Sequence, residues 1–207
     1  FELPEAKTEV SWVDRDTLFV GTDLGGETLT TSGYPVEVRR WQRGTDLRDA
    51  PVIFRGERSD VAVGAARDHT PGFERTIFTR ALDFYNQRTY IEDTLIDVPT
   101  NCTPIPHRQW LFLLPRTEFA GLAGGELGVI ELDRFLAGDR DVRVLVSGTT
   151  VEDLSFTASS LLVTTLDDVA THISSFDLGT WERTELSLPD TAHVVSTSPL
   201  DGDEVWI

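Results

Sequence analysis

The sequence is poor in the residues that sulfur and metal chemistry need. Cys102 is the only cysteine among 207 residues, and methionine is absent. A single cysteine excludes an internal disulfide and a multi-cysteine metal site, so we interpret Cys102 as a small buried apolar group. The histidines are isolated from one another at His69, His107, His172 and His193. Because zinc sites normally show at least one close pair of ligands, we predict no metal site and no cofactor.

Positive charge is also scarce. The chain has 18 Lys and Arg against 35 Asp and Glu, for a net charge of -17. A polyanion would be repelled, which argues against nucleic acid and anionic membranes as partners. No apolar run approaches the roughly 18 residues that a transmembrane helix needs. Residues 1–7 do not resemble a secretory leader. Both ends look like cuts in a longer protein, for which we favour a cytoplasmic location.

The hydrophobic residues, 40% of the chain, are arranged as in strands. They recur with a period near two in short runs separated by Gly, Pro, Asp and Asn, and β-branched and aromatic residues dominate the runs. Residues 17–22, 109–114, 142–146 and 161–165 are examples, and further strands are predicted at 74–84 and 183–188. Only residues 131–138 show helical spacing, and that segment is too short to set the architecture. The fold class is therefore predicted to be all-β.

The predicted strands repeat in groups of four. Four units span approximately residues 8–56, 60–98, 101–147 and 151–188, and an incomplete fifth spans 191–207 with strands at 191–198 and 204–207. A period of about 40 to 50 residues with four strands per unit is the mark of a β-propeller. We therefore predict a partial propeller of about four blades plus part of a fifth. A pair of β-sandwich domains is the rival that strand counting leaves open.

Several segments resemble the propeller of the prolyl oligopeptidase family of serine peptidases, namely residues 12–23, 29–44, 161–172 and 196–206. The most specific part is Ser-Gly-Tyr-Pro at 32–35, between two apolar strands and followed by Trp-Gln-Arg-Gly at 41–44. The resemblance implies a seven-bladed propeller covering an α/β-hydrolase domain, which cleaves peptide bonds after proline while the propeller limits access to short peptides. This chain would hold about four of the seven blades, without the hydrolase domain.

No catalytic residue is predicted within the chain. A nucleophile elbow requires Gly-x-Ser-x-Gly, and no serine here has Gly at both positions two residues away. His172 lies near Asp167 and Asp168, but no oxyanion-hole motif accompanies them. Neighbouring carboxylates are interpreted as acceptors for turn backbones, not as acids or calcium ligands. These pairs are Asp14 with Asp16, Asp139 with Asp141, and Asp201 with Asp203.

The five tryptophans, about one per unit, are interpreted as packing residues, and Trp110 is predicted to be buried between blades. Our first hypothesis is that the chain gates and orients short peptides for the hydrolase domain of the same protein. Candidate contacts in the substrate channel are Arg39, Arg40, Arg75 and Arg80, because a guanidinium can bind a peptide carboxylate bidentately. The alternative is a stand-alone propeller that serves as a scaffold for protein–protein interaction. Alone, the chain is expected to pair as a homodimer or to close into a smaller ring.

Overall fold

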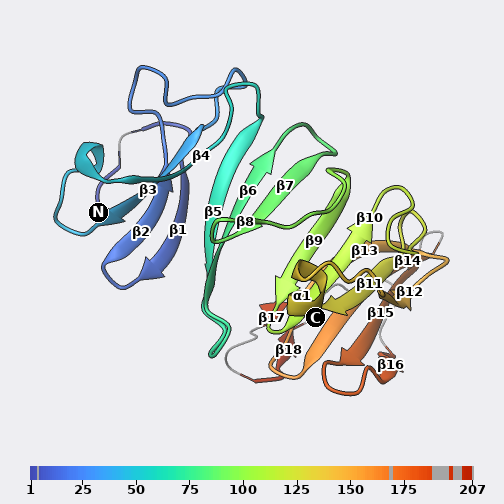
Figure 1. Cartoon of the computed structure of the whole chain (residues 1–207). Coiled ribbons are helices and arrows are strands. Elements are labelled where there is room, and N and C mark those ends of the chain that lie inside the picture. The colour runs from blue at the N-terminus through green and yellow to red at the C-terminus, as the bar shows by residue number, and fades with distance from the viewer. Residues whose placement is uncertain (4, 168–169, 188–195, 198–201, 207) are drawn as a thin grey trace. The chain divides into compact units, whose positions relative to one another are not determined.

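The chain forms four separate antiparallel β-sheets of four strands each (Figure 1). The structure is a computed structural model that describes residues 1–3, 5–167, 170–187, 196–197 and 202–206. In each four-stranded sheet the strands follow one another in chain order, as in a propeller blade. The predicted all-β class with four four-stranded units is confirmed. No described helix is long and apolar enough to span a membrane.

The first two sheets occupy the N-terminal half of the chain. The strands of the first sheet, and a 3-10 turn before its last strand, are β1 (Glu9–Asp14), β2 (Thr17–Gly21), β3 (Glu37–Gln42), η1 (Leu47–Asp49) and β4 (Val52–Arg55). The strands of the second are β5 (Ala62–Asp68), β6 (Arg75–Ala81), β7 (Gln87–Ile91) and β8 (Thr94–Leu95).

The other two sheets follow, and a short helix precedes the last strand of the third. The elements of the third sheet are β9 (Cys102–His107), β10 (Trp110–Pro115), β11 (Leu127–Glu131), α1 (Leu132–Leu136) and β12 (Arg143–Val146). Those of the fourth are β13 (Thr150–Phe156), β14 (Ser160–Asp167), β15 (Ala170–Asp177) and β16 (Arg183–Glu185). A separate pair comprises β17 (Ser196–Thr197) and β18 (Val205–Trp206).

Burial differs between strands in the way that blade packing requires. Every residue of β2 is buried, and β14 is buried from Leu161 to Thr165, whereas the edge strand β1 alternates between exposed and half-buried residues. A strand in the middle of a blade is covered on both faces by neighbouring sheets, so its sequence is a continuous apolar run. An edge strand is covered less completely and alternates.

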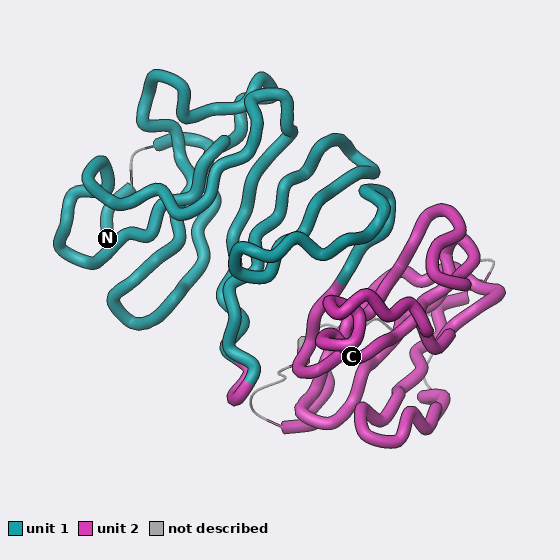
Figure 2. Tube along the Cα trace, in the orientation of Figure 1, with its two compact units in different colours: residues 1–69, 73–104 teal, residues 70–72, 105–207 magenta. Residues whose placement is uncertain are grey.

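The chain divides into two compact units (Figure 2). Unit 1 comprises Phe1–His69 and Phe73–Pro104, and its first two sheets pack through Phe19, Val38 and Val63. An aromatic stack extends this contact, because Phe54 of β4 lies 4.5 Å, ring centre to ring centre, from Phe78 of β6. The β1 strand is tied to β5 by a hydrogen bond of 2.7 Å from Ser11 Oγ to the Ala65 carbonyl.

Unit 2 comprises residues 70–72 and Ile105–Ile207, and its sheets share one large apolar cluster. The buried members come from β10 to β12 on one side and from β14, β15 and the turn after β15 on the other. They are Phe112, Leu127, Val129, Val146, Leu161, Val163, Phe176 and Leu178. The third and fourth sheets therefore pack face to face as neighbouring blades do.

Strand positions follow the sequence prediction closely, and the differences lie mainly at strand ends. The strand predicted at 74–84 ends at Ala81, because residues 82–86 form a turn around the Asp83 carboxylate. The strand predicted at 183–188 ends at Glu185. The strand predicted at 191–198 lies mostly outside the described residues, and β17 covers two of its positions. The helical segment predicted at 131–138 is present as α1.

Candidate functional site

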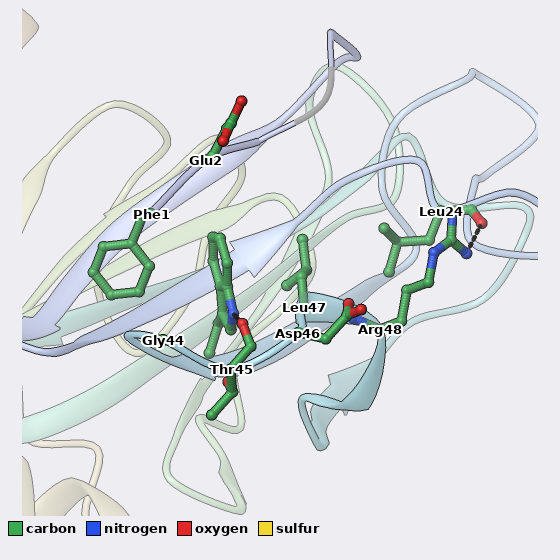
Figure 3. A pocket seen from close by; sticks show the side chains of 9 residues that line it. Phe1, Glu2, Leu24, Gly44, Thr45, Asp46, Leu47 and Arg48 are labelled. Atoms are coloured by element: carbon green, nitrogen blue, oxygen red, sulfur yellow. Dashed lines mark hydrogen bonds between the residues drawn. The ribbon is translucent and has the colours of Figure 1, made fainter.

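A cavity lies beside β3 and η1 of the first sheet, in unit 1 (Figure 3). It has a volume of about 560 Å³. Trp41, from β3, lines this cavity and belongs to the same apolar cluster as Leu47 of η1. Phe1 packs edge-on against Trp41 with ring centres 4.9 Å apart. The other lining residues are Glu2, Leu24, Gly44, Thr45, Asp46, Leu47 and Arg48.

Polar groups around this cavity form hydrogen bonds with the backbone of the residues that line it. Trp41 donates from Nε1 to the Thr45 carbonyl over 2.9 Å. Asp46 caps η1 by accepting a hydrogen bond of 2.8 Å from the backbone N–H of Arg48. The guanidinium of Arg48 in turn donates to the Leu24 carbonyl at 3.0 Å. With these groups engaged, the cavity offers mainly aromatic and aliphatic surface, which suits an apolar partner better than a chemical reaction.

The same face of the first sheet carries further exposed apolar residues. In the strand register Trp12 lies opposite Leu18 and Leu18 opposite Trp41, while Val10 lies opposite Val20. Residues opposite one another in a sheet share a face. Trp12 is 55% exposed, and Val10 is also exposed. This face, which we term the free face of the first sheet, points away from the second sheet, since Phe19 and Val38 make that contact.

A second, narrower cleft lies between the edge strands of the two sheets of unit 1. It has a volume of about 70 Å³ and is lined by residues of β1, β2 and β3 together with Gly64 and Ala65 of β5. The first strand of a blade borders the central channel of a propeller. The β5 residues that line the cleft, Gly64 and Ala65, are small, and the Ala65 carbonyl accepts the hydrogen bond from Ser11.

Three of the four arginines predicted to contact substrate are paired with carboxylates of the same unit. Arg39 lies 2.7 Å from Glu37 and also donates to the Ala50 carbonyl. Arg80 grips Asp60 with two hydrogen bonds of 2.8 and 3.1 Å. The Asp60 carboxylate raises the pKa of Arg80 above its ordinary value. Asp60 is buried, so this pair is an internal element of the second sheet.

The other two arginines differ in exposure. Arg75 is buried and lies 3.2 Å from Asp68. Arg40 is exposed on β3, and its charge contributes to lowering the pKa of Asp14 after the larger effect of the hydrogen bond from the Asp16 backbone. All four arginines are on the second or third strand of their sheets. Their predicted role as substrate contacts stays a prediction.

The histidines and the cysteine lie on separate elements. His69 contacts the Trp12 carbonyl at 3.2 Å, whereas His107, at the end of β9, is buried and stacks on Phe156 with ring centres 4.1 Å apart. His172 is exposed on β15, and His193 is outside the described residues. Cys102 is buried, as expected. Within the described part of the chain, no three His, Cys, Asp or Glu residues gather closely enough to hold a metal ion.

The paired carboxylates hold turns, as the sequence indicated. Asp14 accepts a hydrogen bond of 2.8 Å from the Asp16 N–H, and Asp139 accepts one of 2.9 Å from the Asp141 N–H. These backbone donors favour the charged form and lower the pKa of both Asp14 and Asp139. Asp203 accepts from Thr157 Oγ1 at 2.6 Å, while Asp201 is outside the described residues.

The tryptophans are less uniformly packed than predicted. Trp41 is buried in the first sheet, and Trp110 and Trp181 meet edge-on in unit 2 with ring centres 4.9 Å apart. Trp110 is on the predicted strand but is only half-buried, because it lies at the border of the apolar cluster. Trp12 and Trp206 are exposed. Sequence reasoning also missed the aromatic pair Phe84-Tyr85, whose signal is its place between Asp83 and Asn86 at a turn.

Known proteins resemble the chain over nearly its whole length. It is 27% identical to an uncharacterized peptidase of Sinorhizobium fredii, with all of the chain and 32% of that protein covered. A second uncharacterized peptidase, from Rickettsia prowazekii, is 25% identical over 98% of the chain and 32% of that protein. The chain thus spans about a third of the length of these curated relatives. No family model matches it.

Solved structures give the same result for the fold. A post-proline cleaving enzyme from Rickettsia typhi superposes with a TM-score of 0.77 at 22% identity, over 88% of this chain and 30% of that one. Oligopeptidase B from Trypanosoma brucei superposes with a TM-score of 0.69 at 16% identity, over 90% of this chain and 28% of that one. The chain is therefore a relative of peptidases, and its fold is that of the β-propeller domain in the N-terminal region of prolyl oligopeptidases.

Proposed function

We propose that this chain is a non-catalytic propeller portion of a serine endopeptidase of prolyl oligopeptidase type. In that role it gates and orients short peptides for a hydrolase domain elsewhere in the same protein. The supporting observation is the match of the whole chain to about a third of two peptidases, together with a blade fold like that of a post-proline cleaving enzyme. In this proposal the hydrolase domain, and not this chain, supplies the catalytic groups.

Among the predicted substrate contacts, Arg40 fits the proposal best. Arg39, Arg75 and Arg80 would each have to release an internal carboxylate before they could bind a peptide. Releasing a buried partner leaves an uncompensated charge, which costs about 3–5 kcal/mol. Arg40 is exposed, so it could bind a peptide without first releasing a buried carboxylate. We therefore propose that Arg40 attracts the carboxylate end of short peptides.

The first test measures the activity of the whole protein. Proline-containing peptides of increasing length are offered to it, and a serine-directed phosphonate is used to label its nucleophile. The proposal expects cleavage after proline, a steep decline of kcat/KM with peptide length, and a label outside these 207 residues. Labelling of a serine within them would contradict it. Absence of any hydrolysis would favour the scaffold role instead.

The second test concerns Arg40. In the whole protein, Arg40→Ala should raise KM for peptides with a free carboxyl terminus and leave KM for their amidated forms and kcat unchanged. Arg143→Ala is the matched control, because Arg143 is an exposed strand arginine in unit 2 and its loss changes the net charge equally. If both substitutions had the same effect on KM, Arg40 would act only through its contribution to the net charge of the protein and not as a specific contact for the peptide.

We also propose that the isolated chain pairs through the free face of the first sheet. Contiguous apolar surface of this kind is uncommon on monomers. Light scattering should give about twice the 23.0 kDa mass of the chain, and Trp12→Glu should shift it toward a single copy. A compact monomer would indicate closure into a smaller ring, whereas an extended monomer would contradict both outcomes.

A further inference from the structure

The turn between β6 and β7 presents two aromatic side chains to solvent. Phe84 is 93% exposed and Tyr85 is 66% exposed. Isolated apolar residues on a surface are ordinary, but two adjacent aromatic rings at the tip of a tight turn are not. Turns favour Asp, Asn, Gly and Ser for conformational reasons, and none of those reasons applies to Phe or Tyr. The conformational preferences of turns therefore do not explain why Phe and Tyr stand at this aromatic tip.

The aromatic tip is held rigidly. The Asp83 carboxylate accepts hydrogen bonds from the backbone N–H groups of Tyr85 at 2.7 Å and Asn86 at 2.9 Å, and from the Asn86 side chain. Asn86 Oδ1 accepts from Thr100 Oγ1 at 2.8 Å, and the Gln87 N–H donates to the Thr100 carbonyl at 2.8 Å. Because these hydrogen bonds already fix the backbone of the turn, binding through the aromatic tip costs little backbone entropy.

The aromatic tip lies at the end of the sheets where the chain passes from one blade to the next. The start of β5 pairs with the end of β6, since Ala62 lies opposite Ala81, so the β4–β5 connection reaches this end. Thr100 is part of the next connection, after β8, and bonds to Gln87. In the first sheet the β2–β3 loop is at the corresponding end, because Glu37 lies opposite Arg55 and Thr31 bonds to the Arg58 carbonyl.

A domain attached to a propeller at a junction between blades must leave the propeller at this end. The relatives carry about two thirds of their length outside the part that matches this chain. A folded domain of the same protein is thus the partner nearest to the aromatic tip. Phe and Tyr are also the residue types enriched in the buried centre of contacts between proteins.

We propose that Phe84 and Tyr85 dock into an apolar pocket of a further domain of the same protein and latch the propeller onto it. This inference rests on the proposed function, because it takes the rest of the protein to be a domain that the propeller covers. Loss of the latch would leave each domain folded and raise the fraction of molecules in which the two are apart. Burial of one phenylalanine corresponds to about a ten- to hundredfold change in that equilibrium.

The test places the photoreactive residue p-benzoylphenylalanine at position 84 of the whole protein, and in a control at position 93. Asp93 is exposed in the turn between β7 and β8, at the opposite end of the same sheet. After irradiation, position 84 should cross-link to a peptide outside these 207 residues within one copy of the protein, and position 93 should not. Cross-links to a second copy, to an added peptide substrate, to both ends equally, or to nothing would each overturn the proposal.

A second measurement gives the size of the effect. In the whole protein Phe84→Ser should increase the separated form by about tenfold or more in small-angle scattering, and Phe84→Leu should retain most of the closed form. An unchanged scattering curve for Phe84→Ser would contradict the latch. Neither readout depends on catalysis. A protein that cross-links as expected but cleaves no peptide would therefore refute only the proposed function, and an active protein without the cross-link would refute only the latch.

Discussion

The two units of the molecule both pack their sheets through apolar residues, but they differ in the charged groups that they bury. In unit 1 carboxylates are buried beside arginines: Glu37 is 2% exposed between Arg39 and Arg55, and Asp60 is gripped by Arg80. In unit 2 the third and fourth sheets meet at an apolar cluster that contains eight buried residues. Ion pairs of unit 2, such as Arg183 with Glu185, lie near the surface.

The difference lies beside the blade interfaces and not within them, because the sheets of unit 1 also pack through apolar residues. A buried ion pair contributes little net stability once desolvation is included, but removal of one partner is costly. An apolar cluster contributes stability in proportion to the area it buries. Unit 1 should therefore be sensitive to single charge changes, and unit 2 to truncation of its core.

The largest effect is expected in the core of unit 2. Phe112→Ala removes a fully buried ring from the cluster and should lower the free energy of unfolding by about 3–5 kcal/mol, through lost transfer energy and a cavity. Urea denaturation of the 207-residue chain measures it. Phe84→Ala is the matched control and should change stability by less than about 0.5 kcal/mol, since that ring is exposed. Equal costs would mean that the cluster is not the core of unit 2.

Next in size is the buried ion pair of unit 1. Asp60→Ala removes the carboxylate partner of Arg80 and also the acceptor for the Glu57 N–H. It should lower the free energy of unfolding by about 2–3 kcal/mol. Asp60→Leu combined with Arg80→Leu should recover much of this loss. Loss of the exposed pair of Glu27 and Arg58 through Glu27→Ala should cost less than about 1 kcal/mol. If the double variant were as unstable as Asp60→Ala, the attraction between Asp60 and Arg80 would stabilise unit 1 by more than the free-energy cost of desolvating the two charges.

A smaller effect is expected at the border of the unit 2 cluster. Trp110 is half-buried and packs edge-on against Trp181, so Trp110→Ala should cost about 2 kcal/mol, less than the range for a fully buried tryptophan. Trp12→Ala, on an exposed side chain of unit 1, is the control and should cost below about 1 kcal/mol in a monomeric sample. Thermal unfolding of both variants at low concentration provides the comparison.

Sequence alone predicted the strands well because their positions follow from local patterns. The continuous apolar run of β14 and the alternation of β1 have the periods that sheets impose. Strand ends were less certain. Residues 74–84 read as one strand, yet the Asp83 carboxylate ends it by accepting backbone hydrogen bonds that the sheet would otherwise use.

The candidate sites were harder to predict because they depend on contacts between distant residues. Asp60 and Arg80 are 20 positions apart, and nothing local indicates that they pair. Arg39 and Arg80 therefore looked available for substrate, although each has an internal partner. The exposed ring of Phe84 was missed for a local reason, because the apolar pattern of residues 74–84 predicts burial and the turn at Asp83 ends the strand before Phe84.

The smallest effect tests what the two units share. Asp177 in unit 2 accepts hydrogen bonds from the backbone of Thr180 and Gly179, which lower its pKa below the ordinary value of 3.8. Hydrogen bonds from the Tyr85 backbone and from Asn86 lower the pKa of Asp83 in unit 1 in the same way. A carboxyl group whose pKa is depressed by folding stabilises the protein above its unfolded pKa, and this contribution is lost as the pH falls through the folded pKa.

Asp177→Asn and Asp83→Asn should therefore each lower the urea midpoint slightly at about pH 6, and the difference from the unmodified chain should shrink at about pH 3. Both side chains lie at the surface, so each change should be smaller than the three above. Matching pH profiles would mean that the two units differ in their interiors but stabilise these turns in the same way, through a charged carboxylate that accepts backbone hydrogen bonds. A loss of stability that does not depend on pH in either variant would show that hydrogen-bond geometry, and not charge, stabilises that turn.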